Sequence, residues 1–117
     1  MSGKSFSDRR DDARGRVRAL AQDFAHGGDH DNFFNAIYDD AKGDAAAVPW
    51  ADLEPHPGLS EWIGRSGNLY EGKALDVGCG LGDNAEALAQ LGYDVTAFDL
   101  SATAIDWARE RFPASRV

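Results

Sequence analysis

Apolar residues recur at helical spacing in the first part of the chain. One set with the spacing i, i+3, i+4, i+7 comprises Val17, Leu20, Ala21 and Phe24. It predicts an amphipathic helix over residues 9–25, which the stretch HGGDHD at 26–31 should end. A second set comprises Phe33, Phe34, Ile37 and Ala41. It predicts another helix, with Asn32 in position to cap its first turn.

Prolines and glycines interrupt this pattern in the middle of the chain. The stretch KGDAAAVPWADLEPHPG, residues 42–58, is typical of a loop. After it, Leu59, Trp62 and Ile63 share one side of a short helix. Residues 1–71 are therefore expected to form a helical N-terminal region.

Short apolar runs bounded by glycine begin after Gly72. KALDV at 73–77 is predicted to be one strand and YDVTAFD at 93–99 a second. Helical spacing between the two strands predicts a helix that Gly92 ends. The residues with this spacing are Leu81, Ala85, Leu88 and Ala89.

One more helix is predicted after the second strand. Ser101 is in position to cap it and Pro113 to stop it. Its apolar side comprises Ile105, Ala108 and Phe112. Strand, helix and strand in this order form a parallel βαβ unit with a right-handed crossover. The sequence thus predicts an α/β fold, with helices over residues 1–71 and one βαβα unit over residues 72–117.

Three glycines lie at alternate positions where the first strand meets its helix, in the stretch DVGCGLG at 76–82. Ligands of parallel sheets bind beyond the C-terminal ends of the strands, and residues without Cβ allow a sharp turn and close backbone approach. The second strand ends at Asp99, whose carboxylate is suited to accept hydrogen bonds from the 2′ and 3′ hydroxyls of a ribose. The pattern predicts a site for a cofactor that contains a nucleoside.

Charge near the glycines bears on which nucleoside cofactor binds. In proteins with the dinucleotide fingerprint G-x-G-x-x-G/A, the pyrophosphate binds at the helix N-terminus. Here the third glycine, Gly82, comes one residue early, and Asp83 takes the final position. The carboxylates of Asp83 and Asp76 would repel a pyrophosphate and suit a ligand with a sulfonium and an amino group. These charges favour S-adenosylmethionine over NAD.

At these residues the chain resembles the class I S-adenosylmethionine-dependent methyltransferases. The resemblance covers about residues 72–113. It rests on the acidic residue Asp76, the G-x-G-x-G motif that follows it, Asp99 at the end of the second strand and the sequence DLS at 99–101. The stretch FFNAIYDDA…VPW…PHPGLSEWI resembles, more loosely, the N-terminal lid of small-molecule methyltransferases of the thiopurine and tellurite-resistance type. That family builds a seven-stranded sheet, so the resemblance implies an incomplete Rossmann-like methyltransferase fold.

The resemblance implies a role for each matching residue. Asp76 would bind or orient the methionine amino group, and Asp99 would accept the ribose hydroxyls. Leu100 would cover one face of the adenine, and Trp50 would close the site from the lid. The backbone packed along the methionine and ribose would be that of Gly78, Cys79, Gly80 and Gly82. The sequence singles out no catalytic residue.

Charge is unevenly distributed along the chain. Residues 1–18 hold six of the twelve Lys and Arg and have a net charge of +3, whereas the whole chain has −8. An acidic body argues against nucleic acid as the main ligand. The basic stretch is expected to be the solvated face of a helix, with a nucleic-acid arm as the alternative. The 117 residues, 43% of them apolar, suit a soluble chain with the length of one domain.

Other candidate chemistry is set aside at this stage. The single cysteine, Cys79, cannot form an internal disulfide and has no His or Asp that marks it as a nucleophile. His56, between two prolines, is expected to be structural. No metal is expected, because no zinc spacing is matched by His26, Asp29, His30 and Asp31. A cytoplasmic location is expected, because a single cysteine suits a reducing compartment and no apolar run suits a membrane span or a signal sequence.

The leading prediction is an enzyme that transfers a methyl group from S-adenosylmethionine to a small-molecule acceptor and leaves S-adenosylhomocysteine. Two strands alone leave both edges of a parallel sheet open. The chain is therefore expected to be a fragment of a longer enzyme, inactive alone, that forms a homo-oligomer; pairing with a separate chain that supplies the missing half is an alternative. The competing functions are a non-catalytic assembly module with a vestigial nucleoside site and an NAD-dependent oxidoreductase.

Overall fold

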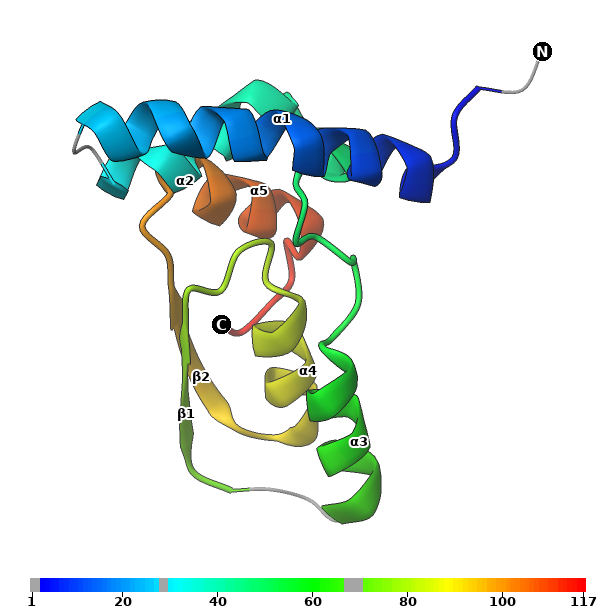
Figure 1. The fold of residues 1–117 in the computed structure, drawn as a ribbon. Coiled ribbons are helices and arrows are strands. Elements are labelled where there is room, and N and C mark those ends of the chain that lie inside the picture. The colour runs from blue at the N-terminus through cyan, green and yellow to red at the C-terminus, as the bar shows by residue number, and fades with distance from the viewer. Residues whose placement is uncertain (1–2, 28–29, 67–70) are drawn as a thin grey trace. The chain divides into compact units, whose positions relative to one another are not determined.

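The computed structural model describes residues 3–27, 30–66 and 71–117 of an α/β chain with two compact units, Met1–Ala51 and Asp52–Val117. Its elements are α1 (Phe6–Gly27), α2 (His30–Ala41), the 3₁₀ helix η1 (Ala45–Ala47), α3 (Pro57–Ser66), β1 (Lys73–Val77), α4 (Asp83–Leu91), β2 (Asp94–Phe98) and α5 (Ala102–Arg111) (Figure 1). The sequence predicted a division between residues 71 and 72, whereas the two compact units divide after Ala51.

The N-terminal helix begins earlier than its apolar spacing predicted. The Ser5 hydroxyl accepts a hydrogen bond from the Asp8 amide (3.0 Å), and the Asp8 carboxylate accepts one from the Ser5 amide (3.4 Å). This reciprocal cap supplies partners for amides that a helix start leaves free, so α1 begins at Phe6. The prediction that Asn32 caps the second helix is wrong, because α2 begins at His30 and Asn32 lies inside it.

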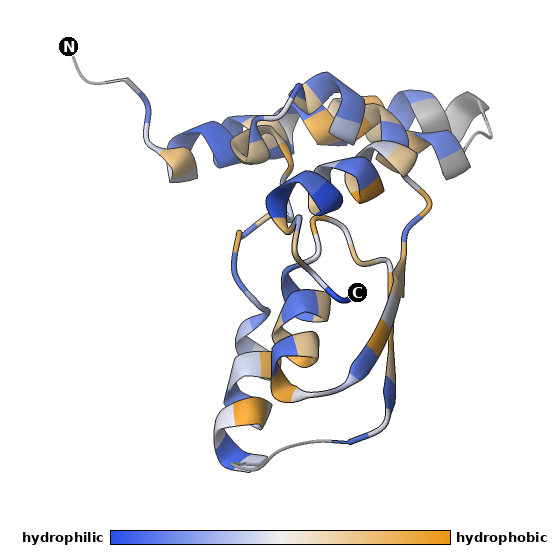
Figure 2. Cartoon of the chain, turned by 180° about the vertical axis from the view of Figure 1, so that it is seen from behind, coloured by the Kyte–Doolittle hydropathy of each residue, from blue (hydrophilic) through white to orange (hydrophobic). Residues whose placement is uncertain are grey.

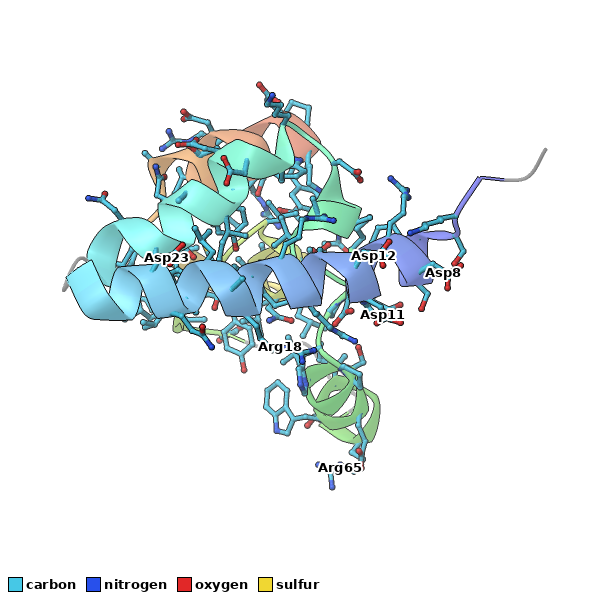
Figure 3. All side chains as sticks on the ribbon, turned by 45° about the horizontal axis from the view of Figure 1, so that its top comes forward. Asp8, Asp11, Asp12, Arg18, Asp23 and Arg65 are labelled. Atoms are coloured by element: carbon cyan, nitrogen blue, oxygen red, sulfur yellow. The ribbon has the colours of Figure 1, made fainter. Side chains whose placement is uncertain are left out.

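The core of the first unit lies among α1, α2 and η1. Its buried apolar residues are Ala13, Ile37, Tyr38, Ala41, Ala46, Val48 and Ala51. The acidic residues Asp8, Asp11 and Asp12 lie near the N-terminal end of α1 (Figure 3). Arg9 and Arg14 of the basic stretch are exposed, as expected for a solvated helix face, and they pair with Asp44 (2.8 Å) and Asp11 (3.0 Å).

The second unit contains the two predicted strands, paired in parallel from Lys73↔Asp94 to Val77↔Phe98. Exposed and less exposed residues alternate along both strands, so each strand has one face toward α4 and one away from it. The strands carry both hydrophobic and hydrophilic residues (Figure 2). The cluster beneath α4 comprises Ala85, Ala89 and Val95, with Ala74, Leu88, Tyr93 and Ala97 packed around it. The opposite face exposes Leu75, Val77 and Phe98.

The helix ends of this unit follow local signals. Gly92 ends α4 with a φ of 112°, in the left-handed region that favours glycine. Ser101 caps α5, its buried hydroxyl accepting the Ala104 amide (3.0 Å). His56 caps α3, because its Nδ1 accepts the Gly58 amide (3.0 Å), so its structural role is confirmed. No helix among the described residues is long and apolar enough to cross a membrane.

Candidate functional site

The glycine loop that follows β1 is bonded directly to the end of β2. The amides of Gly78 and Cys79 both donate to the Phe98 carbonyl, at 2.9 and 3.0 Å. The Gly80 amide donates to the Asp99 carboxylate at 2.9 Å. Three main-chain donors thus hold the tip of the first strand against the end of the second, as parallel strand ends at one sheet edge require.

Asp99 lies at the centre of this junction. One of its oxygens accepts the Gly80 amide and the other accepts the Ser101 amide, each at 2.9 Å. A carboxylate has about four acceptor positions, so each oxygen keeps one for a ligand hydroxyl. Leu100, the next residue, is 69% exposed and offers an apolar surface beside the carboxylate.

Asp76 is a second carboxylate close to the loop, on the face of β1 that α4 covers. Its Oδ2 is buried and has no hydrogen-bond partner among the described residues. Burial raises the pKa of Asp76, the hydrogen bond from the Ala85 amide opposes that rise, and the charge of Asp99 adds to it. An acceptor that is buried without a partner is costly, so this oxygen suits a ligand group that donates a hydrogen bond, such as an ammonium.

The three glycines of the loop have left-handed backbones but different surroundings. Gly78 (φ 70°) has nothing within 4 Å of the place where a Cβ would be, so the space beside it is open to a ligand. Gly80 has a φ of 54°. Gly82 (φ 90°) faces α5 instead, because its Cβ would lie 3.3 Å from the Ala108 Cβ and 3.6 Å from the Phe112 ring. The Cβ side of Gly82 therefore serves helix packing, and its contact with the cofactor stays a prediction.

Four amides of the glycine loop have partners inside the protein. Those of Gly78, Cys79 and Gly80 bond the end of β2, and that of Gly82 donates to the Cys79 carbonyl (3.0 Å). A pyrophosphate site needs free amides at this turn. The amides of Gly78, Cys79, Gly80 and Gly82 are therefore not free to bind a pyrophosphate.

Asp83 does not supply the repulsive charge that the sequence suggested. Its two carboxylate oxygens accept a bidentate pair of hydrogen bonds from Arg111, at 2.8 and 2.9 Å. The positive guanidinium offsets the carboxylate, so the argument from Asp83 against a pyrophosphate loses its force. The engaged amides of Gly78, Cys79, Gly80 and Gly82 remain as an argument against a pyrophosphate at this turn.

Cys79 has the surroundings of a structural thiol. Burial, with the nearby charges of Asp76 and Asp99, raises the pKa of Cys79 to about 11. A thiol with that pKa is almost wholly protonated at neutral pH and is a poor nucleophile. This agrees with the sequence, in which no His or Asp marks Cys79 as a nucleophile.

Trp50 belongs to the first compact unit, whereas the glycine loop and Asp99 belong to the second. Its Nε1 donates to the Tyr38 hydroxyl at 2.7 Å, and its ring meets those of Tyr38 and Phe34 edge to face, with centroids 5.8 Å apart in each pair. Its side chain remains 41% exposed. The role of Trp50 in closing the cofactor site stays a prediction.

A cavity of about 400 Å³ lies on the α5 side of the loop and not at Asp99. Its lining includes Cys79, Gly82, Glu86, Ile105, Arg109 and Phe112. It shares only Cys79 and Gly82 with the predicted cofactor residues, so it is distinct from the ribose position. No group of three metal-ligating side chains occurs in residues whose side chains are described; those of His26, Asp29, His30 and Asp31 lie outside them.

Two contacts of the site were not predicted from the sequence. Arg111 reaches Asp83 and the Leu81 carbonyl (2.9 Å). The Asn84 side chain accepts the His56 amide (2.8 Å) and so links the start of α4 to the segment before α3. Both contacts join residues 28 to 30 positions apart, and neither follows from local spacing.

Comparison with known proteins supports the resemblance to methyltransferases that the sequence indicates. A family profile described as "Methyltransferase domain" matches residues 74–117. Ubiquinone biosynthesis O-methyltransferases are 38% identical over 78 residues in Erwinia tasmaniensis and 40% identical over 78 residues in Yersinia pestis. Each alignment covers 59% of this chain and 32% of the relative, so the chain spans about a third of their length.

A solved structure gives a matching result for the fold. It comes from work on the "Conversion of a Disulfide Bond into a Thioacetal Group during Echinomycin Biosynthesis", with a TM-score of 0.56 and 38% identity over 69% of this chain and 33% of that one. The α/β arrangement is therefore that of an incomplete Rossmann-like fold. With the profile match at the glycine loop and both strands, these likenesses support an S-adenosylmethionine-dependent methyltransferase family for this chain.

Proposed function

We propose that this chain supplies the cofactor-binding part of an enzyme that transfers a methyl group from S-adenosylmethionine to a small-molecule acceptor. The observation that carries the proposal is the position of Asp99, whose carboxylate is bonded to the Gly80 amide of the glycine loop (2.9 Å). A carboxylate that can accept hydrogen bonds from ribose hydroxyls then lies beside a turn of glycines, as an adenosyl group requires.

The residues at the junction fit this cofactor. Asp99 would accept the ribose hydroxyls, and exposed Leu100 would lie against the adenine. The buried Oδ2 of Asp76 would accept from the methionine ammonium. The open side of Gly78 would leave room for the ligand between these groups.

The cofactor, when bound, supplies a methyl carbon made electrophilic by its sulfonium. The protein's part is to bind and orient that group, because positioning accounts for much of the rate of such a transfer. The names of the relatives, O-methyltransferases of ubiquinone biosynthesis, make an oxygen on a small molecule the first acceptor to test.

The ribose assignment is best tested with paired ligands. Calorimetry with adenosine and 2′-deoxyadenosine should show that the wild-type chain prefers adenosine by about tenfold, the value of one charge-assisted hydrogen bond. Asp99→Asn should reduce that preference, whereas Asp94→Asn, at the exposed far end of β2, should keep it. Equal preference in wild type and Asp99→Asn would contradict the role of Asp99.

The competing functions are separated by titration with S-adenosylhomocysteine and NAD. Binding of S-adenosylhomocysteine without NAD supports the methyltransferase proposal, and binding of NAD alone overturns it. Absence of binding by both this chain and any longer natural form would favour the non-catalytic assembly module. The same titration on both forms measures how much of the pocket these 117 residues supply.

A further inference from the structure

The last turn of α5 contacts the exit of the glycine loop through Arg111. Nη1 of Arg111 donates to the Leu81 carbonyl (2.9 Å) and to Oδ2 of Asp83 (2.8 Å). Nη2 donates to Oδ1 of Asp83 (2.9 Å). One guanidinium therefore holds both residues that flank Gly82 in the sequence.

Apolar contacts surround the same point. The backbone of Gly82 packs so closely on α5 that a Cβ would lie 3.3 Å from the Ala108 Cβ and 3.6 Å from the Phe112 ring. The Arg111 guanidinium lies 4.8 Å from the centroid of the Phe112 ring, within cation–π distance. The consecutive residues Leu81, Gly82 and Asp83 are thus fixed against the C-terminal end of α5.

The ion pair is shielded from solvent. The side chains of Arg111 and Asp83 are 21% and 18% exposed. By contrast, the Arg109–Asp106 pair on the same helix is 4.0 Å apart, with 79% and 76% exposure. Solvent screens the exposed pair and makes it nearly neutral in energy, whereas loss of one partner from the shielded pair leaves a poorly solvated charge.

We propose that Arg111 is a positioning residue of the cofactor site, an inference that rests on the proposed function. Arg111 fixes Leu81 and Asp83, and Gly82 between them donates back to the Cys79 carbonyl (3.0 Å). The held turn therefore fixes the course of the backbone from Cys79 onward, next to Gly78 and Gly80. Arg111 acts through this backbone and not by contact with the cofactor.

Calorimetry with S-adenosylhomocysteine on the full chain tests the proposal, with Arg109→Gln as the matched control. Arg111→Gln should weaken binding by about tenfold or more, because the shielded carboxylate of Asp83 loses its partner. Arg109→Gln should bind like wild type. Arg111→Lys should bind between wild type and Arg111→Gln, since one ammonium cannot make the bidentate contact.

A double variant shows whether the pair acts as one unit. Asp83→Asn should weaken binding, and Arg111→Gln combined with Asp83→Asn should bind no more weakly than Arg111→Gln alone. Additive losses would overturn the claim that the two side chains act on the loop together.

Hydrogen exchange separates positioning from general stability. In Arg111→Gln, amides 78–83 should exchange faster, while those described in α1 and α2 keep wild-type rates. Faster exchange throughout the chain, or an Arg111→Gln variant equal to Arg109→Gln in both measurements, would overturn the proposal. If wild type does not bind S-adenosylhomocysteine, the proposed function fails for this chain, and exchange at 78–83 still decides whether Arg111 holds the loop.

Discussion

Gly78 and Gly82 share a left-handed backbone but differ in what a side chain would meet. The place of a Cβ at Gly78 is open, and that at Gly82 lies 3.3 Å from the Ala108 Cβ. The G-x-G-x-G pattern treats the glycines alike, whereas the structure leaves the Cβ direction of Gly78 open and packs that of Gly82 on α5. This difference can be measured by substitution.

Alanine at each position separates stability from binding. Gly82→Ala should lower the free energy of unfolding by about 2 kcal/mol or more, because left-handed strain and overpacking on α5 add together. Gly78→Ala should lower the free energy of unfolding by only about 1 kcal/mol, the cost of backbone strain. Relative to the stability that each variant loses, Gly78→Ala should weaken S-adenosylhomocysteine binding more than Gly82→Ala does. Urea unfolding and calorimetry measure the two effects; a Gly78→Ala chain that binds like wild type would contradict ligand access at this position.

Asp76 gives the fold a dependence on pH. Burial raises the pKa of this carboxyl above its usual 3.8, so between 3.8 and the raised value the folded chain binds more protons than the unfolded chain. The free energy of unfolding therefore falls as pH rises through that window and stays lowered above it. Asp76→Asn should stabilise the chain at pH 7 and have little effect well below pH 3.8, as thermal unfolding at several pH values would show.

The same substitution should cost function. Asp76→Asn removes the charge that would face the methionine ammonium, so it should weaken S-adenosylhomocysteine binding at pH 7 while it stabilises the fold. Asp106→Asn, on the exposed face of α5, is the control and should change neither quantity. A variant that loses both stability and binding would contradict the account of a destabilising site carboxylate.

Residues with local signals were predicted correctly from the sequence. Gly92 and Ser101 end and begin helices through their own backbone or hydroxyl, and such signals need only a few neighbouring positions. Arg111 and Asp83 are 28 positions apart, and no spacing rule links them. The part of the charge argument that rested on Asp83 was wrong for this reason, since it omitted a partner that only the tertiary fold brings near.

At the scale of elements, the ends of helices decide which boundaries could be predicted. Both strands and the two helices of residues 72–117 were predicted within a residue or two, because glycine, serine and proline mark their ends. The first helix starts at Phe6 rather than near residue 9, because the polar cap of Ser5 and Asp8 acts before the apolar spacing begins. The sequence S-F-S-D contains this signal, and apolar periodicity alone does not detect it.

The cap of α5 provides a test at this scale. The Ser101 hydroxyl is buried and accepts the Ala104 amide. Ser101→Ala should therefore lower the free energy of unfolding by about 1 kcal/mol, the usual value of an N-cap. Urea unfolding measures this loss, and Ser60→Ala on the exposed side of α3 should stay within about 0.5 kcal/mol of wild type. Equal stabilities for the two variants would contradict the cap.

At the scale of the whole molecule, the uncovered face of the two-stranded sheet stands out. Leu75 and Val77 are 62% and 67% exposed, and Phe98 is 48% exposed. Contiguous apolar residues of this size are typical of surfaces that bind protein. The homo-oligomer predicted from the sequence would bury them.

Sedimentation over a range of concentrations tests self-association through this face. Leu75→Lys should weaken the association constant by about tenfold or more, because a buried leucine contributes about 1.5–3 kcal/mol. Val117→Lys replaces an exposed apolar residue outside the sheet and should leave association unchanged. If Leu75→Lys sediments like wild type at every concentration, the sheet face is not the contact.

The bonds between the glycine loop and the end of β2 have a consequence for rates. The Phe98 carbonyl and the Asp99 carboxylate together accept hydrogen bonds from three loop amides. The loop can therefore move away from the end of β2 only if all three hydrogen bonds break. A ligand must then enter a junction that is already assembled, without a slow opening step before capture. The observed association rate should rise in proportion to ligand concentration and show no plateau.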